Sequence, residues 1–371
     1  MKIAQITPVY SPYAGGIGSV AQEYALALSK EGNDVKVFTP MYDPNVGLDA
    51  NISRIKPWYK WGNAALVPRL IWKLRNFDIL HLHYPFYGGA ESTALASLIW
   101  RKPLVITYHM RPVASGWQEG IFRLYRLLIE PIIFLISKKI LVSSFDYAKS
   151  VGLKSKKLIE LPFSVDTDRF APGDAPEIRA SLGIDDNAKV IIFVGGLDDA
   201  HYFKGVDVLL EACSLIRDDV NWHLIIVGDG NLRQKYQDKA LNKNISSRVY
   251  FAGRVDNDDL PKYYQASDIH VLPAINRCEA YGLVTLEAGS SGLPSIVSNL
   301  PGVRILVKNR ETGLIAQPND AKDLAATLTF LLQNNELRKR FGKSARARIE
   351  ARFSRSKVLD KLKELYVETI K

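Results

Sequence analysis

The sequence predicts an α/β protein made of two doubly wound, Rossmann-like domains, and three observations support this prediction. The chain has 371 residues, whereas one domain typically takes roughly 100–200. Short apolar runs alternate with longer amphipathic stretches along both halves, which is typical of parallel sheets covered by helices. The alternation is interrupted over residues 161–176, where three prolines and several turn formers cluster. We therefore place the domain boundary at residue 170.

Individual elements follow from the spacing of apolar residues. Continuous apolar runs of four or five residues are typical of buried strands, and apolar residues at helical spacing indicate helices. The expected strands are residues 35–38, 79–82, 104–107, 190–194, 223–227 and 269–272. The expected helices are residues 20–30, 206–216 and 231–240, together with one that starts at Gly282.

The composition, with 47% hydrophobic and 24% charged residues, is that of a globular protein and excludes a disordered or fibrous chain. Cys213 and Cys278 are too few for a disulfide framework, and no Cys/His cluster suits zinc. The longest apolar run, residues 127–136, contains Glu130 and Pro131 and is too short to span a bilayer. Because the N-terminus begins directly as a strand, we expect no signal peptide and a cytoplasmic location.

The net charge of +10 is concentrated in one half of the chain. Residues 1–170 hold 21 Lys and Arg against 13 Asp and Glu, a net charge of +8, whereas the rest of the chain carries +2. Such an excess suggests an anionic partner: nucleic acid, an acidic membrane surface or a phosphorylated substrate. No zinc finger or RNA-binding signature accompanies the charge, so we expect no nucleic acid.

Glycine-rich turns between a strand and a helix are the first candidates for a ligand site. A helix N-terminus offers free N–H groups and a partial positive charge, which suit phosphate. Gly15 and Gly16 precede the first helix, and Gly195 and Gly196 close the strand at 190–194. Glycine allows a ligand to approach the backbone closely. The first turn lacks GxGxxG spacing, which argues against an NAD-dependent dehydrogenase.

Polar side chains follow the expected strands. Lys204 stands just before a helix, where an ammonium group can neutralise phosphate, and His109 ends the run at 104–108. Glu279 falls in the loop before Gly282, and Glu287 lies about one and a half turns into the following helix. Carboxylates accept hydrogen bonds from hydroxyl groups. Each residue also has an ordinary structural interpretation, as a surface lysine, a buried histidine or a surface carboxylate.

His81 and His83 alternate with apolar residues in the strand at 79–82 and the position after it. We interpret them as strand residues and assign them no chemistry.

Together these stretches resemble the retaining glycosyltransferases of family GT4, which have the GT-B fold. The most specific match is an E-x7-E motif, from Glu279 to Glu287. Four further segments match in order and spacing, namely residues 15–18, 165–172, 292–298 and 312–315.

The resemblance implies roles for particular residues. Glu279 would bind the hydroxyls of the donor sugar and Glu287 those of the ribose, Lys204 would hold the diphosphate, and His109 would lie beside the transferring sugar. Gly16 would let the first loop approach the diphosphate. The implied catalytic residues are His109, Lys204 and Glu279. The implied donor-binding residues are Gly15, Gly16, Gly196, Lys204, Arg254, Glu279, Ala280, Tyr281, Gly282, Leu283, Val284 and Glu287.

The resemblance also implies how the domains share the work. Residues 1–170 would bind the acceptor, residues 171–352 the nucleotide sugar, and residues 353–371 would form a helix crossing back onto the first domain. Neither a cofactor nor a metal is expected, and Asp166 and Asp168 form only a DxD-like sequence in the linker. The family usually has Arg at the position of Gly196, so either Arg254 supplies a second cation or one cation is enough.

The implied reaction moves a sugar from a UDP- or GDP-sugar to a hydroxyl of a glycan, lipid-linked or phosphorylated acceptor, with retention of configuration. The enzyme would be a hexosyltransferase of glycan or glycolipid biosynthesis. The alternative is a nucleotide-sugar-binding protein without catalysis.

The aromatic and basic residues at 58–75 leave two interpretations open. They form either an interfacial patch that meets anionic lipid at the inner face of the membrane, or an ordinary amphipathic helix with core tryptophans.

Overall fold

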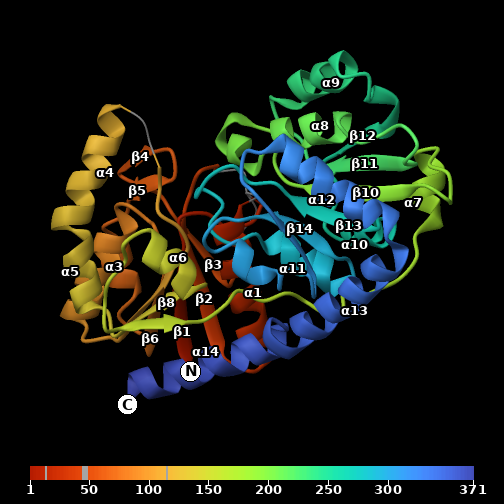
Figure 1. Cartoon of the computed structure of the whole chain (residues 1–371). Coiled ribbons are helices and arrows are strands. Elements are labelled where there is room, and N and C mark those ends of the chain that lie inside the picture. Colours follow the sequence, from red (N-terminus) through yellow and green to blue (C-terminus); the bar gives the residue numbers. More distant parts are fainter. Residues whose placement is uncertain (13–14, 44–48, 114–115) are drawn as a thin grey trace. The chain divides into compact units, whose positions relative to one another are not determined.

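The computed structural model describes residues 1–12, 15–43, 49–113 and 116–371 (Figure 1). The chain divides into two units. The first comprises Met1–Phe163 together with Val358–Lys371, and the second comprises Ser164–Lys357. The sequence placed these divisions after residues 170 and 352. Within the described part of the chain, no helix combines the length and the apolar character needed to cross a bilayer.

The first unit contains a parallel sheet of seven strands, counted over the described residues, in the order β3-β2-β1-β6-β7-β8-β9. The strands are β1 (Lys2–Ile6), β2 (Asp34–Pro40), β3 (Ile52–Ile55), β6 (Ile79–Tyr84), β7 (Leu104–Tyr108), β8 (Lys139–Val142) and β9 (Leu158–Glu160). The chain runs outward from β1 first to one edge and then to the other, which is the doubly wound arrangement that the sequence predicts. The carboxyl ends of the strands therefore share one edge.

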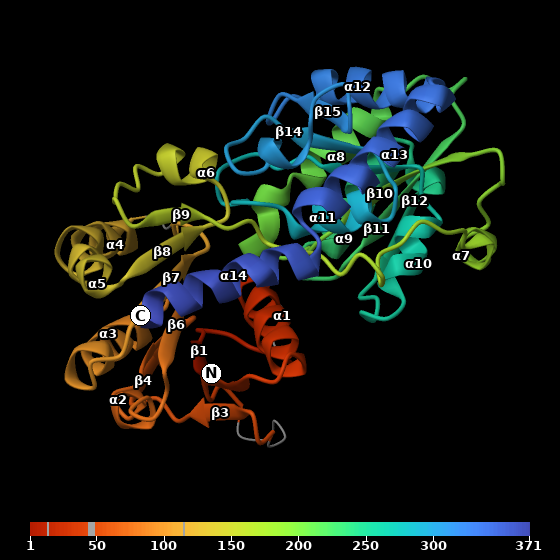
Figure 2. The same ribbon diagram turned by 90° about the horizontal axis from the view of Figure 1, so that it is seen from below.

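Helices cover both faces of this sheet. They are α1 (Gly16–Lys30), α2 (Leu70–Lys73), α3 (Gly89–Ile99), α4 (Trp117–Leu128), α5 (Glu130–Ile136), α6 (Phe145–Ser150) and α14 (Arg355–Ile370), the last of which enters this unit at Val358. His81 of β6 contacts the rings of Tyr24 from α1 and Tyr366 from α14, so these two helices share a face (Figure 2). Tyr84 points to the other face and contacts Phe134 of α5.

Two sequence expectations in this unit are wrong. The apolar run at 127–136 is not one helix but spans the junction of α4 and α5, because Pro131 takes a first-turn position of α5, where no backbone donor is needed. Residues 58–75 form an antiparallel hairpin of β4 (Tyr59–Trp61) and β5 (Ala64–Leu66), followed by the single turn of α2. The tryptophans at 58, 61 and 72 are exposed, so they are not core residues.

The second unit contains a six-stranded parallel sheet in the order β12-β11-β10-β13-β14-β15. The strands are β10 (Lys189–Val194), β11 (Trp222–Val227), β12 (Val249–Gly253), β13 (Ile269–Leu272), β14 (Ser295–Ser298) and β15 (Gly313–Ala316). The α-helices are α7 (Pro176–Ser181), α8 (Val206–Ser214), α9 (Arg233–Asn242), α10 (Leu260–Gln265), α11 (Leu283–Ser290), α12 (Ala321–Gln333) and α13 (Asn335–Arg352). Single 3₁₀ turns are η1 (Asp199–Lys204), η2 (Ser246–Arg248) and η3 (Arg304–Leu306). The expected strands at 190–194, 223–227 and 269–272 are confirmed.

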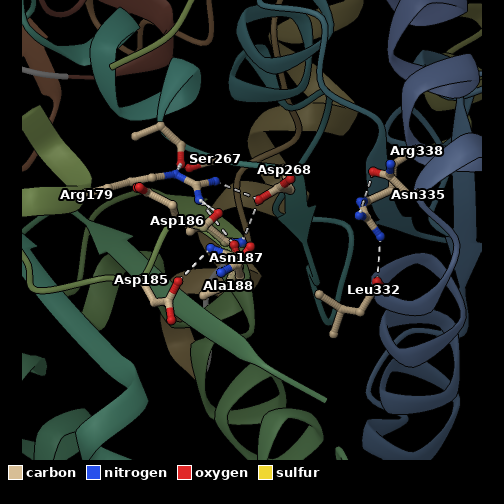
Figure 3. Close-up of polar contacts among 12 residues, drawn as sticks. Arg179, Asp185, Asp186, Asn187, Ala188, Ser267, Asp268, Leu332, Asn335 and Arg338 are labelled. Atoms are coloured by element: carbon tan, nitrogen blue, oxygen red, sulfur yellow. Dashed lines mark hydrogen bonds and ion pairs between the residues drawn. The ribbon is translucent and has the colours of Figure 1, made fainter. Parts of the chain in front are cut away.

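Two arginines join elements of the second unit away from the carboxyl edge of its sheet (Figure 3). Arg179 of α7 forms an ion pair with Asp268 at 2.8 Å, and Asp268 also accepts a hydrogen bond from the backbone of β10. Arg338 of α13 is buried and donates to the carbonyl oxygens of Leu331 and Leu332 at the end of α12. These contacts fix the frame that presents the loops at the opposite edge.

Candidate active site

An ion pair between Lys204 and Glu279 lies at the carboxyl edge of the second sheet. The Nζ atom of Lys204 donates to Oε2 of Glu279 at 2.7 Å, and both side chains are largely buried, with 14% and 12% of their surfaces exposed. A Cβ atom on Gly195 would lie 2.6 Å from Cδ of Lys204, so the lysine stem passes directly over the end of β10. The sequence therefore identified two groups that the fold brings into contact, although they are 75 residues apart.

Two glycines in the left-handed region start the helices beside this pair. Gly205 has φ +78° and precedes α8, and a Cβ atom there would lie 2.0 Å from the carbonyl oxygen of Pro273. Gly282 has φ +98° and precedes α11. Because the first N–H groups of an α-helix have no partner within the helix, those of Leu283 and Val284 are suited to an anion, and the dipole of α11 adds partial positive charge.

Glu287 lies in α11 as the sequence predicts, and its carboxylate is held by a neighbouring helix. Oε2 accepts a hydrogen bond from the hydroxyl of Tyr264 in α10 at 2.8 Å. Tyr264 is fully buried, and burial together with the charge of Glu287 raises its pKa well above 10. The tyrosine therefore stays a donor, which fixes the direction of the carboxylate. Sequence reasoning missed Tyr264, which is separated from Glu287 by 23 residues.

The space beside Gly196 is occupied by a histidine–carboxylate pair. A Cβ atom on Gly196 would lie 2.7 Å from Nδ1 of His201, and this nitrogen in turn lies 2.8 Å from Oδ1 of Asp198. Arg254, the sequence's candidate for a second cation, is exposed just after β12. Since β12 is two strands from β10, Arg254 shares the carboxyl edge with Lys204 at a distance of about 10 Å or more between their strands. The sequence gave no signal for His201.

Ala280 and Tyr281 are buried in the loop between Glu279 and α11. Their side chains therefore belong to the packing that supports this loop.

In the first unit, His109 lies immediately after β7 and is 4% exposed. Its Nε2 atom is 2.9 Å from Nδ1 of His83, and its ring stacks on Phe163 with centroids 5.0 Å apart. Burial and the neighbouring His83 lower the pKa of His109 well below 6.5, so the ring is neutral at pH 7. His83, to which the sequence assigned no chemistry, is thus the direct partner of a predicted site residue.

Gly15 and Gly16 start α1 at the carboxyl edge of the same sheet. A Cβ atom on either glycine would meet no atom of the described residues within 4 Å. Internal packing therefore does not require glycine at these positions, and an approaching ligand remains a reason for it. No group of three or more His, Cys, Asp or Glu residues suited to a metal ion occurs in the described ranges.

Two family models match the chain, one to each unit. The model described as Glycosyltransferase Family 4 matches residues 14–169, and the model described as Glycosyl transferases group 1 matches residues 174–348. Two parallel α/β units with this pair of matches define a glycosyltransferase of the GT-B fold. The chain belongs to family 4 of these enzymes.

Relatives of this chain are similar over most of its length. A phosphatidyl-myo-inositol mannosyltransferase of Mycobacterium leprae is 27% identical, with 100% of this chain and 97% of the relative covered. An Escherichia coli UDP-Gal:α-D-GlcNAc-diphosphoundecaprenol α-1,3-galactosyltransferase is 29% identical, with 90% and 84% covered. The solved structure of Anabaena Alr3699/HepE in complex with UDP-glucose has a TM-score of 0.80 at 18% identity, with 99% and 100% covered. This structure establishes the likeness in fold.

Proposed function

We propose that this glycosyltransferase moves a hexose from a nucleoside-diphosphate sugar to an acceptor hydroxyl, with retention of configuration and without a metal ion. The observation that carries the proposal is the buried Lys204–Glu279 pair beside the start of α11. It combines a cation and free N–H groups, which suit a diphosphate, with a carboxylate that suits sugar hydroxyls.

Each group has a distinct task in this reaction. Lys204 and the first N–H groups of α11 stabilise the negative charge that develops on the leaving diphosphate. Glu279 orients the sugar through its hydroxyls, and Glu287, held by Tyr264, accepts hydrogen bonds from the ribose. A lysine and a helix N-terminus take the place that a divalent cation has in other phosphate sites. The reaction then proceeds by attack of the acceptor on the face from which the nucleotide leaves, without a covalent intermediate.

The donor base is proposed to be uridine, with guanosine as the alternative. Two of the proteins described above carry uridine in their names or titles, as UDP-Gal and UDP-glucose.

Nucleotide binding and sugar transfer test this function separately. Thermal shifts with UDP, GDP, ADP, NAD and a short DNA duplex identify the ligand, since saturation at 100 times the dissociation constant stabilises by about 2.7 kcal/mol. Transfer from the matching nucleotide sugars is then followed by NMR of the anomeric proton, with and without EDTA. We expect a shift with one diphosphate, a retained anomeric configuration and no effect of EDTA.

Substitutions identify the residues that act. Glu279→Ala, Lys204→Ala and His109→Ala should each lower transfer at least ~100-fold, the scale of losing one preorganised polar contact. Near-normal transfer in all three would refute the assignment. Normal nucleotide binding with no transfer to any acceptor would instead favour a nucleotide-sugar-binding protein without catalysis.

We further propose a lipid-linked acceptor reached at an anionic membrane surface, because α4 and α5 expose their most apolar faces. Trp117, Ile121, Leu124 and Leu128 recur along one side of α4 and are between 46% and 69% exposed. The opposite side of α4 contacts the unit through Phe122 and Tyr125, which pack on Tyr87. An amphipathic helix with its apolar side outward is typical of proteins that lie in a bilayer interface.

Neighbouring residues extend this surface and supply positive charge. Trp61 of the hairpin stacks on Trp117 at 5.6 Å. A hollow of about 350 Å³ beside α5 is lined by Arg111, Lys154 and Lys157, together with apolar residues. Cations next to exposed apolar side chains complement anionic headgroups. Both the Mycobacterium leprae and the Escherichia coli relatives have lipid-linked acceptors in their names.

Co-sedimentation with liposomes tests this surface. We expect binding to vesicles with phosphatidylglycerol that weakens at high salt, and less binding to pure phosphatidylcholine. Leu124→Ser should reduce binding, whereas Leu215→Ser, which removes a similarly exposed leucine from the second unit, should not. Equal binding to neutral and anionic vesicles would refute the proposal.

A further inference from the structure

A continuous chain of buried hydrogen bonds runs through the first unit and ends at His109. Its members lie on neighbouring strands β1, β6 and β7 and on helix α14, and each is at most 4% exposed. In order they are Thr107, His81, Tyr366, Gln5, His83 and His109. The histidines come from alternate positions of β6 and from the end of β7, so one face of the sheet carries them all.

The distances leave no gap in this chain. Nε2 of His81 lies 2.7 Å from Oγ1 of Thr107, and Nδ1 of His81 contacts the hydroxyl of Tyr366. Gln5 joins the two halves, with Nε2 3.1 Å from the Tyr366 hydroxyl and Oε1 2.8 Å from Nε2 of His83. Nδ1 of His83 then lies 2.9 Å from Nε2 of His109.

The orientation of the Gln5 amide sets the direction of every hydrogen bond. An amide oxygen only accepts, so Nε2 of His83 must carry a proton and donate it to Oε1 of Gln5. A neutral His83 then has a bare Nδ1 atom, which can only accept, so Nε2 of His109 carries a proton and donates. Nδ1 of His109 is left with its lone pair and makes no hydrogen bond to the described residues.

The other half of the chain agrees with this direction. The Gln5 amide nitrogen donates to the Tyr366 hydroxyl, whose own proton is then free to donate to Nδ1 of His81. His81 consequently carries its proton on Nε2 and donates it to Thr107. If His81 instead donated to Tyr366, the tyrosine proton would have no acceptor in the chain, which is costly in a buried site.

The three histidines are neutral, as this argument requires. Burial lowers the pKa of His83 to about 3 and lowers those of His81 and His109 well below 6.5. Turning the Gln5 amide around would reverse every bond and move the His109 proton to Nδ1. The network therefore has two self-consistent directions, which offer opposite groups to a ligand: an acceptor in the direction observed and a donor in the reverse one.

We propose that Gln5, His83 and Tyr366 are positioning residues that hold His109 with its proton on Nε2, so that Nδ1 accepts a hydrogen bond from a substrate hydroxyl. The inference rests on the proposed function, in which His109 lies beside the transferring sugar. The C-terminal helix α14 contributes to the site through Tyr366, in addition to packing on the sheet.

NMR of ¹⁵N-labelled histidine tests the proposal, because the two-bond couplings of the ring distinguish the tautomers without any need for activity. In the unsubstituted enzyme at pH 7.5 we expect His81, His83 and His109 all to carry the proton on Nε2. Resonances are assigned by substituting the histidines one at a time. A His109 ring with its proton on Nδ1 would overturn the inference.

Tyr366→Phe removes the hydroxyl that fixes the direction of the chain. We expect the His109 signal to become a mixture of tautomers and kcat to fall about 10-fold, the cost of about one hydrogen bond, while the KM for the nucleotide sugar changes little. Tyr236→Phe, at a buried tyrosine of the second unit, should leave both readouts unchanged. An unaltered His109 tautomer in Tyr366→Phe would overturn the role of Tyr366.

The two readouts separate this inference from the function on which it rests. A changed tautomer with unchanged kcat would overturn the contact between His109 and the substrate, although the positioning network would stand. Loss of transfer in His109→Ala together with an unaltered tautomer in Tyr366→Phe would support the catalytic role and overturn the positioning.

Discussion

Lys204 and Glu279 each depend on the other while the site holds no nucleotide. Removing an ion from water costs several kcal/mol, and a close partner with good geometry repays much of this cost. The 2.7 Å contact provides such a partner. Replacing only one of the two residues leaves a buried charge without its partner, so the Lys204→Ala and Glu279→Ala variants should also unfold more easily than the unsubstituted enzyme. Their activities must therefore be measured below the unfolding transition.

Tyr264→Phe should weaken nucleotide binding without abolishing transfer. The substitution deletes the hydroxyl that donates to Glu287 at 2.8 Å, and a hydrogen bond to a charged group contributes about 1.5–3 kcal/mol. We expect the dissociation constant for UDP or GDP to rise about 10-fold in isothermal titration calorimetry, with a smaller effect on kcat. Tyr263→Phe, at the adjacent and less buried tyrosine, is the control. Unchanged affinity in Tyr264→Phe would separate Glu287 from the ribose.

Residues of the proposed site differed in how well they could be predicted from the sequence. Glu279, Gly282 and Glu287 stand within nine positions of one another, so a local pattern contains them. Tyr264, His201 and His83 act through contacts formed only on folding, and each is of a type common in protein interiors. Gln5 and Tyr366 are 361 residues apart, a separation at which no spacing rule applies.

At the scale of elements, the parallel strands were predicted well because each is a continuous buried run, for example the wholly buried β6 and β13. The region from residue 58 to 75 was predicted poorly. Its apolar residues are exposed, so their spacing reflects an outer surface rather than burial against a sheet. The apolar side of α4 also faces outward, which reverses the usual relation between hydrophobic periodicity and the core.

Arg338→Ala should destabilise the junction of α12 and α13. The guanidinium is buried and satisfies the carbonyls of Leu331 and Leu332, which have no partner at the end of a helix. Losing charged hydrogen bonds and leaving buried carbonyls unpaired should cost about 2–3 kcal/mol, measured by urea unfolding of the second unit's fluorescence signal. Lys339→Ala, one position further along and exposed, should change stability by less than about 0.5 kcal/mol. Equal effects would contradict this account.

At the scale of the whole molecule, the two units differ in how they hold their histidines. The first unit buries His81, His83 and His109 as neutral rings, whereas the second buries His270 and holds His223 half-buried. In all five, burial lowers the pKa below 6.5. Protonation below that pH therefore favours the unfolded chain, and the effect should be greater for the first unit.

The first unit should accordingly lose stability faster in mild acid. Because the folded histidines bind protons less readily than the unfolded ones, their contribution to stability is complete above pH 6.5 and declines as the pH falls toward the folded pKa values. Each ring contributes about 1.4 kcal/mol per pH unit in this range. Three rings give a loss of about 4 kcal/mol between pH 6.5 and 5.5. Glu130, whose pKa burial raises above 4.5, acts in the opposite sense and offsets part of it.

Hydrogen exchange followed by mass spectrometry measures both units in one sample. The slowest amides of β6 should show a larger decrease in opening free energy between pH 7 and 5.5 than those of β11, after correction for intrinsic exchange rates. His83→Gln, which keeps a polar side chain and removes one titrating ring, should reduce the decrease in β6 by about 1.4 kcal/mol. Equal decreases in both strands would mean that the histidine chain opens to water before the unit unfolds.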